Sequence, residues 1–150
     1  MKRIVPDATR CAGCRACEVF CSDIHENVVS PKLSRITIIN PGALEEKPMP
    51  IVCRQCQEPK CAEVCPTDAL YYDLKAQIVV FNKEECISCG NCAEACPFGA
   101  ILLHPETGMP LKCDLCGGNP VCVKHCTALA LSLEEIPDEI LIKRKRFLIK

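Results

Sequence analysis

The stretch Cys86-Ile87-Ser88-Cys89-Gly90-Asn91-Cys92-Ala93-Glu94-Ala95-Cys96-Pro97 has the spacing C-x2-C-x2-C-x3-C-P. This spacing is typical of bacterial [4Fe–4S] sites, where four thiolates hold an iron–sulfur cube. Cysteines at every third residue drift around the axis of a regular helix, so we expect a loop, and Gly90 suits its unusual dihedral angles. In chains with two clusters the fourth cysteine, here Cys96, binds the other cluster. One such run therefore predicts a second cluster nearby.

Three further cysteine quartets accompany this one, and together the four use all 16 cysteines of the 150-residue chain. Their internal spacings are x2-x2-x3, x2-x4-x3, x2-x2-x3 and x2-x5-x3 in chain order. In that order the quartets are Cys11, Cys14, Cys17 and Cys21; Cys53, Cys56, Cys61 and Cys65; Cys86, Cys89, Cys92 and Cys96; Cys113, Cys116, Cys122 and Cys126. Because no quartet lacks a ligand, four [4Fe–4S] clusters are the simplest count, and no [3Fe–4S] variant is expected.

Zinc and disulfides are the alternative uses of so many cysteines. Structural zinc sites usually join two C-x2-C pairs from separate segments, whereas three cysteines in one loop with a distant fourth suit an iron–sulfur cube better. An even cysteine count also permits disulfides. However, Met1–Pro6 leads to Cys11 without the apolar segment of a signal peptide. We therefore expect a cytoplasmic, reducing location, which favours metal over disulfides.

Composition narrows the possible functions further. The chain contains four Phe, two Tyr and no Trp, so its core is thin and bound metal should supply much of the folding energy. We expect the apo chain to be largely unfolded. The formal net charge is −1, and four clusters with their thiolates would bring it to roughly −9, which argues against a nucleic-acid partner. No apolar stretch approaches the length that spans a bilayer.

The segments between the quartets predict a repeated α+β unit with short helices and small antiparallel hairpins. Each quartet is followed by a short helical turn and then a strand. Strands are expected at 3–5, 35–39, 70–72, 77–81, 101–103 and 128–131. Residues 35–39 with residues 27–30 are interpreted as an inserted hairpin, and residues 77–81 as the partner of 70–72. Residues 134–150 are interpreted as a docking tail, with a solvated basic end as the alternative.

Over roughly residues 3–133, the sequence resembles the four-cluster iron–sulfur subunits of the dimethyl sulfoxide reductase type. The resemblance rests on the quartet spacings and on two segments, Lys112-Cys113-Asp114-Leu115-Cys116 and Cys65-Pro66-Thr67-Asp68-Ala69-Leu70. Such subunits serve molybdenum and tungsten oxidoreductases, formate dehydrogenases, some hydrogenases and carbon monoxide dehydrogenase. The short length looks most like the small ferredoxin-like subunit of tungsten aldehyde oxidoreductases.

The resemblance implies two ferredoxin-like 2[4Fe–4S] modules with crossed ligation. The four implied ligand sets are named here by one member each. They are the Cys14 set (Cys11, Cys14, Cys17, Cys126), the Cys116 set (Cys21, Cys113, Cys116, Cys122), the Cys56 set (Cys53, Cys56, Cys61, Cys96) and the Cys89 set (Cys65, Cys86, Cys89, Cys92). Residues 1–34 and 106–133 would form an outer module and residues 35–105 an inner one. Ser22 and Thr127 replace the proline that follows the last cysteine in ferredoxins, which puts only the local turn in doubt.

Other residues that could carry chemistry have simpler interpretations. His104, His125 and His25 are expected to be surface or packing residues, with a hydrogen bond to sulfur as the alternative. Tyr71, Tyr72 and Phe98 are expected to exclude water from the clusters. The sequence contains no phosphate-binding loop, no Ser–His–Asp pattern and no catalytic carboxylate pair, so no catalytic residue is assigned.

These observations predict a non-catalytic electron relay. It would connect a catalytic tungsten or molybdenum pterin subunit to a soluble acceptor such as a ferredoxin or a flavin subunit. The best match for the partner is a tungsten aldehyde oxidoreductase; a formate dehydrogenase, a hydrogenase or a carbon monoxide dehydrogenase is the alternative. Self-stacking into longer wires, a free polyferredoxin and a metal-stabilised interaction module also remain open.

Overall fold

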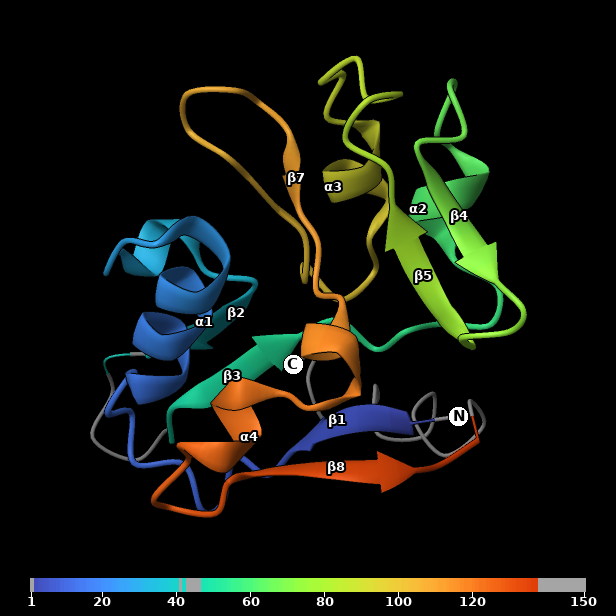
Figure 1. Ribbon diagram of the computed structural model, residues 1–150. Helices are drawn as coiled ribbons and strands as arrows, with labels where there is room; N and C mark the ends of the chain where they lie inside the picture. The colour runs from blue at the N-terminus through green and yellow to red at the C-terminus, as the bar shows by residue number, and fades with distance from the viewer. Residues whose placement is uncertain (1, 41, 43–46, 138–150) are drawn as a thin grey trace.

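The computed structural model describes residues 2–40, 42 and 47–137 (Figure 1). Short helices alternate with pairs of strands, but the helices begin within the cysteine quartets, whereas the sequence analysis expected them after the quartets. The helices are α1 (Ala16–Glu26), α2 (Lys60–Glu63), α3 (Asn91–Ala95) and α4 (Val121–Lys124), with 3-10 turns η1 (Pro31–Leu33) and η2 (Leu115–Gly118). The strands are β1 (Lys2–Pro6), β2 (Ile36–Ile39), β3 (Met49–Val52), β4 (Leu70–Asp73), β5 (Ile78–Phe81), β6 (Leu102–Leu103), β7 (Pro110–Leu111) and β8 (Leu131–Glu135).

The described strands pair into four separate two-stranded antiparallel sheets. Three of these are hairpins between neighbouring strands: β2–β3, β4–β5 and β6–β7. In the turn of β4–β5, the Asp73 carboxylate accepts hydrogen bonds from the backbone N–H groups of Lys75 and Ala76, at 2.7 and 3.1 Å. This side-chain turn chemistry fixes the register of the hairpin that the sequence predicts at 77–81.

The fourth sheet joins the two ends of the described chain. Strand β1 pairs with β8 from Lys2 opposite Glu135 to Pro6 opposite Leu131, and the two run together along one side of the molecule (Figure 1). The sequence predicts β1, but the strand expected at 128–131 overlaps β8 only at Leu131, and the first two residues of the predicted tail, Glu134 and Glu135, belong to β8. The pairing of the two strands is not predicted. The pairing places the loop of the first quartet beside the strand that follows the fourth quartet.

Strand β2 has a different partner from the one expected. It pairs with β3, with Ile36 opposite Val52, so the predicted hairpin between residues 27–30 and 35–39 is wrong. Val28 and Val29 lie on the surface, and Asn27 ends α1 in the left-handed conformation. The alternating burial of Ile36 and Ile38 marks β2 as a half-buried strand, but this pattern does not identify the strand opposite.

Buried side chains form two clusters. The larger contains five cysteines and Ile4, Ile36, Ile38, Val52, Ala100, Leu115 and Leu131; the smaller contains Leu70, Val79, Ile101, Cys61 and Cys92. The β2–β3 hairpin contributes to the larger cluster, alongside the first and fourth quartets, and it contacts α1 and β1. This packing differs from the expected division, which placed residues 35–52 with the inner quartets.

Two further predictions concern the membrane and the tail. Among residues 2–40, 42 and 47–137, no helix has the length and apolar composition that crossing a bilayer requires. Of the predicted docking tail, residues 138–150 lie outside the part of the chain that the structure describes.

Candidate iron–sulfur sites

None of the sixteen cysteines is in a disulfide, and the fold brings cysteines together across quartet boundaries. The Cys14 set lines a hollow that opens to solvent, and its wall includes Cys11, Cys14, Cys17 and Cys126. The remaining wall is mostly apolar and includes Ile38, Ala130 and Leu131. The pKa of Cys17 is raised to about 12, mainly by burial. The nearby negative charges of Glu18, Cys126 and Cys14 raise it further. Cys126 therefore lies with the first quartet although its sequence neighbours belong to the fourth.

The Cys89 set forms the second hollow, which also opens to solvent. Cys86, Cys89 and Cys92 line it together with Cys65 of the second quartet, and Leu70, Phe81 and Ile87 complete the apolar wall. The arrangement matches the Cys14 set: three cysteines come from one loop, and the fourth follows a helix of another quartet.

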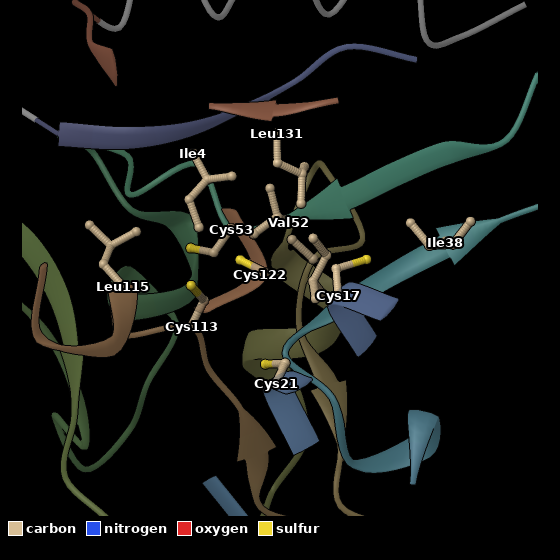
Figure 2. Close-up of a cluster of buried hydrophobic side chains, with 12 residues drawn as sticks. Ile4, Cys17, Cys21, Ile38, Val52, Cys53, Cys113, Leu115, Cys122 and Leu131 are labelled. Atoms are coloured by element: carbon tan, nitrogen blue, oxygen red, sulfur yellow. The ribbon is translucent and has the colours of Figure 1, made fainter. Parts of the chain in front are cut away.

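The other two sets are identified by the mutual influence of their thiols. Burial raises the pKa of Cys122 to about 12, and the next largest contributions come from Cys21 and Cys116. The pKa of Cys61 is likewise raised to about 12 by burial, with contributions from Cys53, Cys96 and Cys56. Cys61 is thus close to the other members of the Cys56 set, whereas the thiols that influence Cys122 include Cys17 of the Cys14 set as well as Cys21 and Cys116. Figure 2 shows the sulfur atoms of Cys53, Cys113 and Cys122 directed into the same interior, although the resemblance assigns Cys53 to a different set from the other two.

Each of the four last cysteines of a quartet receives backbone N–H groups at its sulfur. Arg35 N–H donates to Cys21 (3.3 Å), Ala100 N–H to Cys96 (3.4 Å) and Ala130 N–H to Cys126 (3.2 Å). At Cys65 burial raises the pKa, but hydrogen bonds from the Thr67 and Leu70 N–H groups outweigh it and leave the pKa lowered. Such donors stabilise a thiolate over a thiol.

The cysteine loops share a backbone feature that the sequence-based interpretation identified only at Gly90. The residue two positions after the first cysteine of each quartet has a positive φ: Gly13 at 67°, Gln55 at 48°, Ser88 at 56° and Leu115 at 58°. Three of these are not glycine, so each adopts a conformation that costs roughly 1–2 kcal/mol. The bend turns the N–H groups of Gln55 and Ser88 toward Cys53 Sγ and Cys86 Sγ, both at 3.4 Å.

The three histidines have structural partners. The ring of His125 stacks on Phe20 with centroids 3.8 Å apart, and His104 Nδ1 accepts the N–H groups of Glu106 and Thr107. The packing interpretation fits both. His25 Nε2 lies 3.0 Å from Asp114 Oδ1, and its Nδ1 lies 2.8 Å from the Cys21 carbonyl and 3.8 Å from Cys21 Sγ. The hydrogen bond to Asp114, then those to Cys116 and Cys21, raise the pKa of His25 to about 12.

The expected role of the aromatic residues is met in part. Tyr72 packs against the smaller buried cluster and Phe98 against the larger, where the Arg54 guanidinium lies 5.3 Å from the Phe98 ring centroid. Tyr71 is 45% exposed because it occupies the outer face of β4, so it does not screen this interior from water.

The residues present fit iron–sulfur clusters. Four thiols line each of two apolar hollows, the remaining thiols lie close enough to influence one another's pKa values, and backbone N–H groups point at sulfur. These features are the ligation, burial and hydrogen bonding that iron–sulfur proteins supply to their clusters.

Comparison with known proteins agrees with this chemistry. A family model described as a 4Fe-4S dicluster domain matches residues 45–136. The polyferredoxin-like subunit of an aliphatic sulfonate oxidoreductase from Pyrococcus furiosus is 45% identical over 125 residues, 82% of this chain and 69% of the relative. The iron-sulfur subunit of a formate dehydrogenase from Wolinella succinogenes is 39% identical over 121 residues, 76% of this chain and 60% of the relative.

A solved structure shows the same fold. A chain in the active-site complex BamBC of benzoyl-coenzyme A reductase matches with a TM-score of 0.53 and 29% identity, over 99% of this chain and 90% of that chain. The likeness extends over all four quartets.

Proposed function

Because this chain belongs to the family of 4Fe-4S dicluster domains, we propose that its sixteen cysteines hold four [4Fe–4S] clusters in the crossed sets. It is an iron–sulfur electron-transfer subunit of the kind found in oxidoreductase complexes and is not itself the catalytic subunit. The observation that carries the proposal is the gathering of thiols from different quartets, such as Cys126 with Cys11, Cys14 and Cys17.

The chain's own residues supply ligands, hydrogen bonds and cover. Each set would hold its cluster by four thiolates, and a bound cluster accepts and releases one electron without making or breaking substrate bonds. Backbone N–H groups at Cys21, Cys96 and Cys126 offset the negative charge on sulfur. Apolar residues such as Leu70 and Leu131 exclude water from the hollows. Full ligation by four cysteines leaves no site for a substrate.

Two of the sets reach the surface, which supports a relay with two ends. Cys14 and Cys89 are the exposed members of their sets, whereas the members of the Cys56 and Cys116 sets are buried or half-buried. Ile87 lies beside Cys89, is 62% exposed and offers an apolar contact to a partner. A diffusing carrier needs one accessible site, whereas a relay between two partners needs two.

We propose a catalytic subunit with a tungsten or molybdenum pterin cofactor as one partner, with a tungsten aldehyde oxidoreductase as the leading candidate. The relatives named as subunits of a sulfonate oxidoreductase and a formate dehydrogenase support a separate catalytic subunit. A cytoplasmic ferredoxin or flavin subunit would be the other partner. A pull-down from the native source, with metal analysis of the largest co-eluting chain, tests this. Recovery of the chain alone at all concentrations would favour a free polyferredoxin.

The cluster count is tested on protein purified without oxygen. About sixteen irons per chain, four for each cube, and broad visible absorption that dithionite bleaches are expected. A colourless protein that contains zinc, or far fewer irons, would overturn the proposal.

The crossed ligation is tested with two double variants that differ in one position. Cys53→Ala with Cys96→Ala removes two ligands of the Cys56 set, so about three intact clusters should remain. Cys86→Ala with Cys96→Ala damages both the Cys89 set and the Cys56 set, so only about two should remain. Spin counting of the reduced clusters measures both numbers. The reverse order would mean that each quartet binds its own cluster.

A further inference from the structure

Lys112 is a buried cation at the junction between the two buried clusters of side chains. Its side chain is 4% exposed. The ammonium donates hydrogen bonds to the carbonyl oxygens of Cys113 (2.9 Å) and Val79 (3.2 Å) and to Gln55 Oε1 (3.3 Å). Cys113 belongs to the larger cluster and Val79 to the smaller. These hydrogen bonds connect the two halves of the interior.

Gln55 completes this connection. It is fully buried, its Nε2 donates to the Cys113 carbonyl at 2.7 Å, and its Oε1 accepts from Val79 N–H at 3.0 Å. A fixed amide beside the ammonium restricts the position of the cation. Lys112 is thus held in one place by surrounding polar groups.

The three oxygen acceptors of Lys112 are uncharged, so the anions that balance it must come from elsewhere. A buried cation is stable only when it is paired. Lys112 directly precedes Cys113 and donates to its carbonyl, and its partner Gln55 donates a backbone N–H to Cys53 Sγ at 3.4 Å. The thiolates of Cys53 and Cys113, one from the Cys56 set and one from the Cys116 set, are therefore the anions placed to balance the ammonium, and their side chains lie together in Figure 2.

We propose that Lys112 is a positioning residue that raises the reduction potentials of the Cys56 and Cys116 sets above the values they would have without its charge. The inference rests on the proposed function, because it requires clusters at these two sets. A nearby cation stabilises the reduced, more negative state of a cluster, and low local dielectric strengthens the effect. The Cys14 and Cys89 sets lie nearer the surface, where solvent screens such charges. Lys112 thus makes the two covered sets better electron acceptors than they would be without its charge.

The test is a redox titration, followed by electron paramagnetic resonance, of the holoprotein and its variants. Lys112→Met removes the charge and keeps the length of the side chain, and Lys112→Gln is a second neutral variant that can still donate a hydrogen bond. In both, two of the four reduction steps should become harder by at least about tenfold in equilibrium constant, which is 59 mV for a one-electron couple. Lys112→Arg keeps the charge and should leave these steps close to their native values.

Lys60→Met is the matched control. Lys60 also directly precedes a cysteine of the Cys56 set, Cys61, but its side chain is 58% exposed and pairs with Glu63 at 2.7 Å. Removing this screened charge should change the equilibrium constants by less than about twofold.

Iron content separates the possible failures. A native protein with far fewer than about sixteen irons would overturn the proposed function first. Full iron content in the neutral variants with unshifted potentials, or equal shifts in all four steps, would overturn the role of Lys112 alone. If both neutral variants lose iron while Lys112→Arg retains it, Lys112 is a structural residue and the proposal is wrong.

Discussion

Glu18 shows how one buried carboxylate can join two elements of a thin core. It lies in the first turn of α1, is 1% exposed, and accepts a hydrogen bond from the Ile38 N–H of β2 at 2.6 Å. Arg15 pairs with its other oxygen at 3.4 Å. The sequence shows only an acidic residue beside Cys17, and acidic residues are usually exposed. The role of Glu18 depends on where β2 packs against α1, and the sequence analysis did not predict this contact.

Replacing Glu18 with Ala should destabilise the holoprotein, because the Ile38 N–H stays buried without an acceptor. The expected cost is roughly 1–3 kcal/mol, measured as faster loss of visible absorption in denaturant. Glu18→Gln retains an acceptor and should lose less. Glu94→Ala is the control, since Glu94 also lies in a first helical turn but is exposed. Equal effects of Glu18→Ala and Glu94→Ala would show that only the helix dipole matters.

Asp114 should make the holoprotein more sensitive to acid. The hydrogen bond from His25 lowers the pKa of this carboxyl to about 2 from its ordinary value of 3.8, with help from the N–H of Cys116. Because the pKa of Asp114 is lower in the folded protein, its ionised carboxylate stabilises the fold above pH 3.8. This stabilisation is lost as the pH falls toward 2 and the carboxylate becomes protonated. Asp114→Asn keeps a side-chain oxygen for Cys116 N–H but loses the charge.

The measurement is the ratio of cluster-loss rates between the Asp114→Asn variant and the native chain across this pH range. The variant should lose its clusters faster at neutral pH, by at most roughly tenfold because Asp114 is partly exposed and solvent screens the pair. The two rates should converge near pH 2. A ratio that does not change with pH would contradict this account.

At the scale of elements, strands and turns with local sequence signals could be predicted, but the pairing of strands far apart in the sequence could not. The β4–β5 hairpin follows from two β-branched or aromatic runs and the turn residues between them. Strand β2 was identified by its isoleucines, but its partner β3 follows a nine-residue separation, Asn40–Pro48, and contains Pro50. The left-handed loop residues Gln55, Ser88 and Leu115 gave no signal, because non-glycine residues rarely adopt that conformation.

The loop of the first quartet should be more sensitive to a methyl group than the loop of the fourth. Gly13 and Gly117 have nearly the same φ, 67° and 65°. A Cβ on Gly13 would also lie 2.9 Å from Pro48 Cγ, whereas one on Gly117 would meet nothing within 4 Å. Gly13→Ala should therefore accelerate cluster loss more than Gly117→Ala, which carries only the backbone strain of roughly 1–2 kcal/mol. Indistinguishable rates would mean that Pro48 can move aside.

At the scale of the molecule, cysteine sulfur makes up a large part of the interior. Cys17, Cys21, Cys53, Cys113 and Cys122 belong to the larger buried cluster of side chains, and Cys61 and Cys92 to the smaller. The spacing of the quartets predicted this, because each cluster needs four thiolates that are sheltered from water. The sequence could not show that β1 and β8 pair, nor that Lys112 occupies the junction, since both depend on how the halves pack.

Removal of iron should unfold the whole chain. Once a chelator takes the metal, the interior keeps its cysteines but loses the bonds that hold them together, and few aromatic side chains remain to compensate. Circular dichroism should lose its helical and strand signal, and the hydrodynamic radius should increase in size-exclusion chromatography. An apo chain that stays compact, with a native spectrum, would show that side-chain packing alone is sufficient.

The pairing of β1 with β8 has a consequence for protein synthesis. Lys2 leaves the ribosome long before its partner Glu135, whereas β4 and β5 are separated by one short turn and can pair as soon as both emerge. The earliest cysteines, Cys11 and Cys14, must therefore remain exposed to oxidants until Cys126 arrives at their side. The thiols between Cys53 and Cys96 can therefore come together before the fourth quartet has emerged, whereas the Cys14 set cannot be completed until Cys126 has been synthesised.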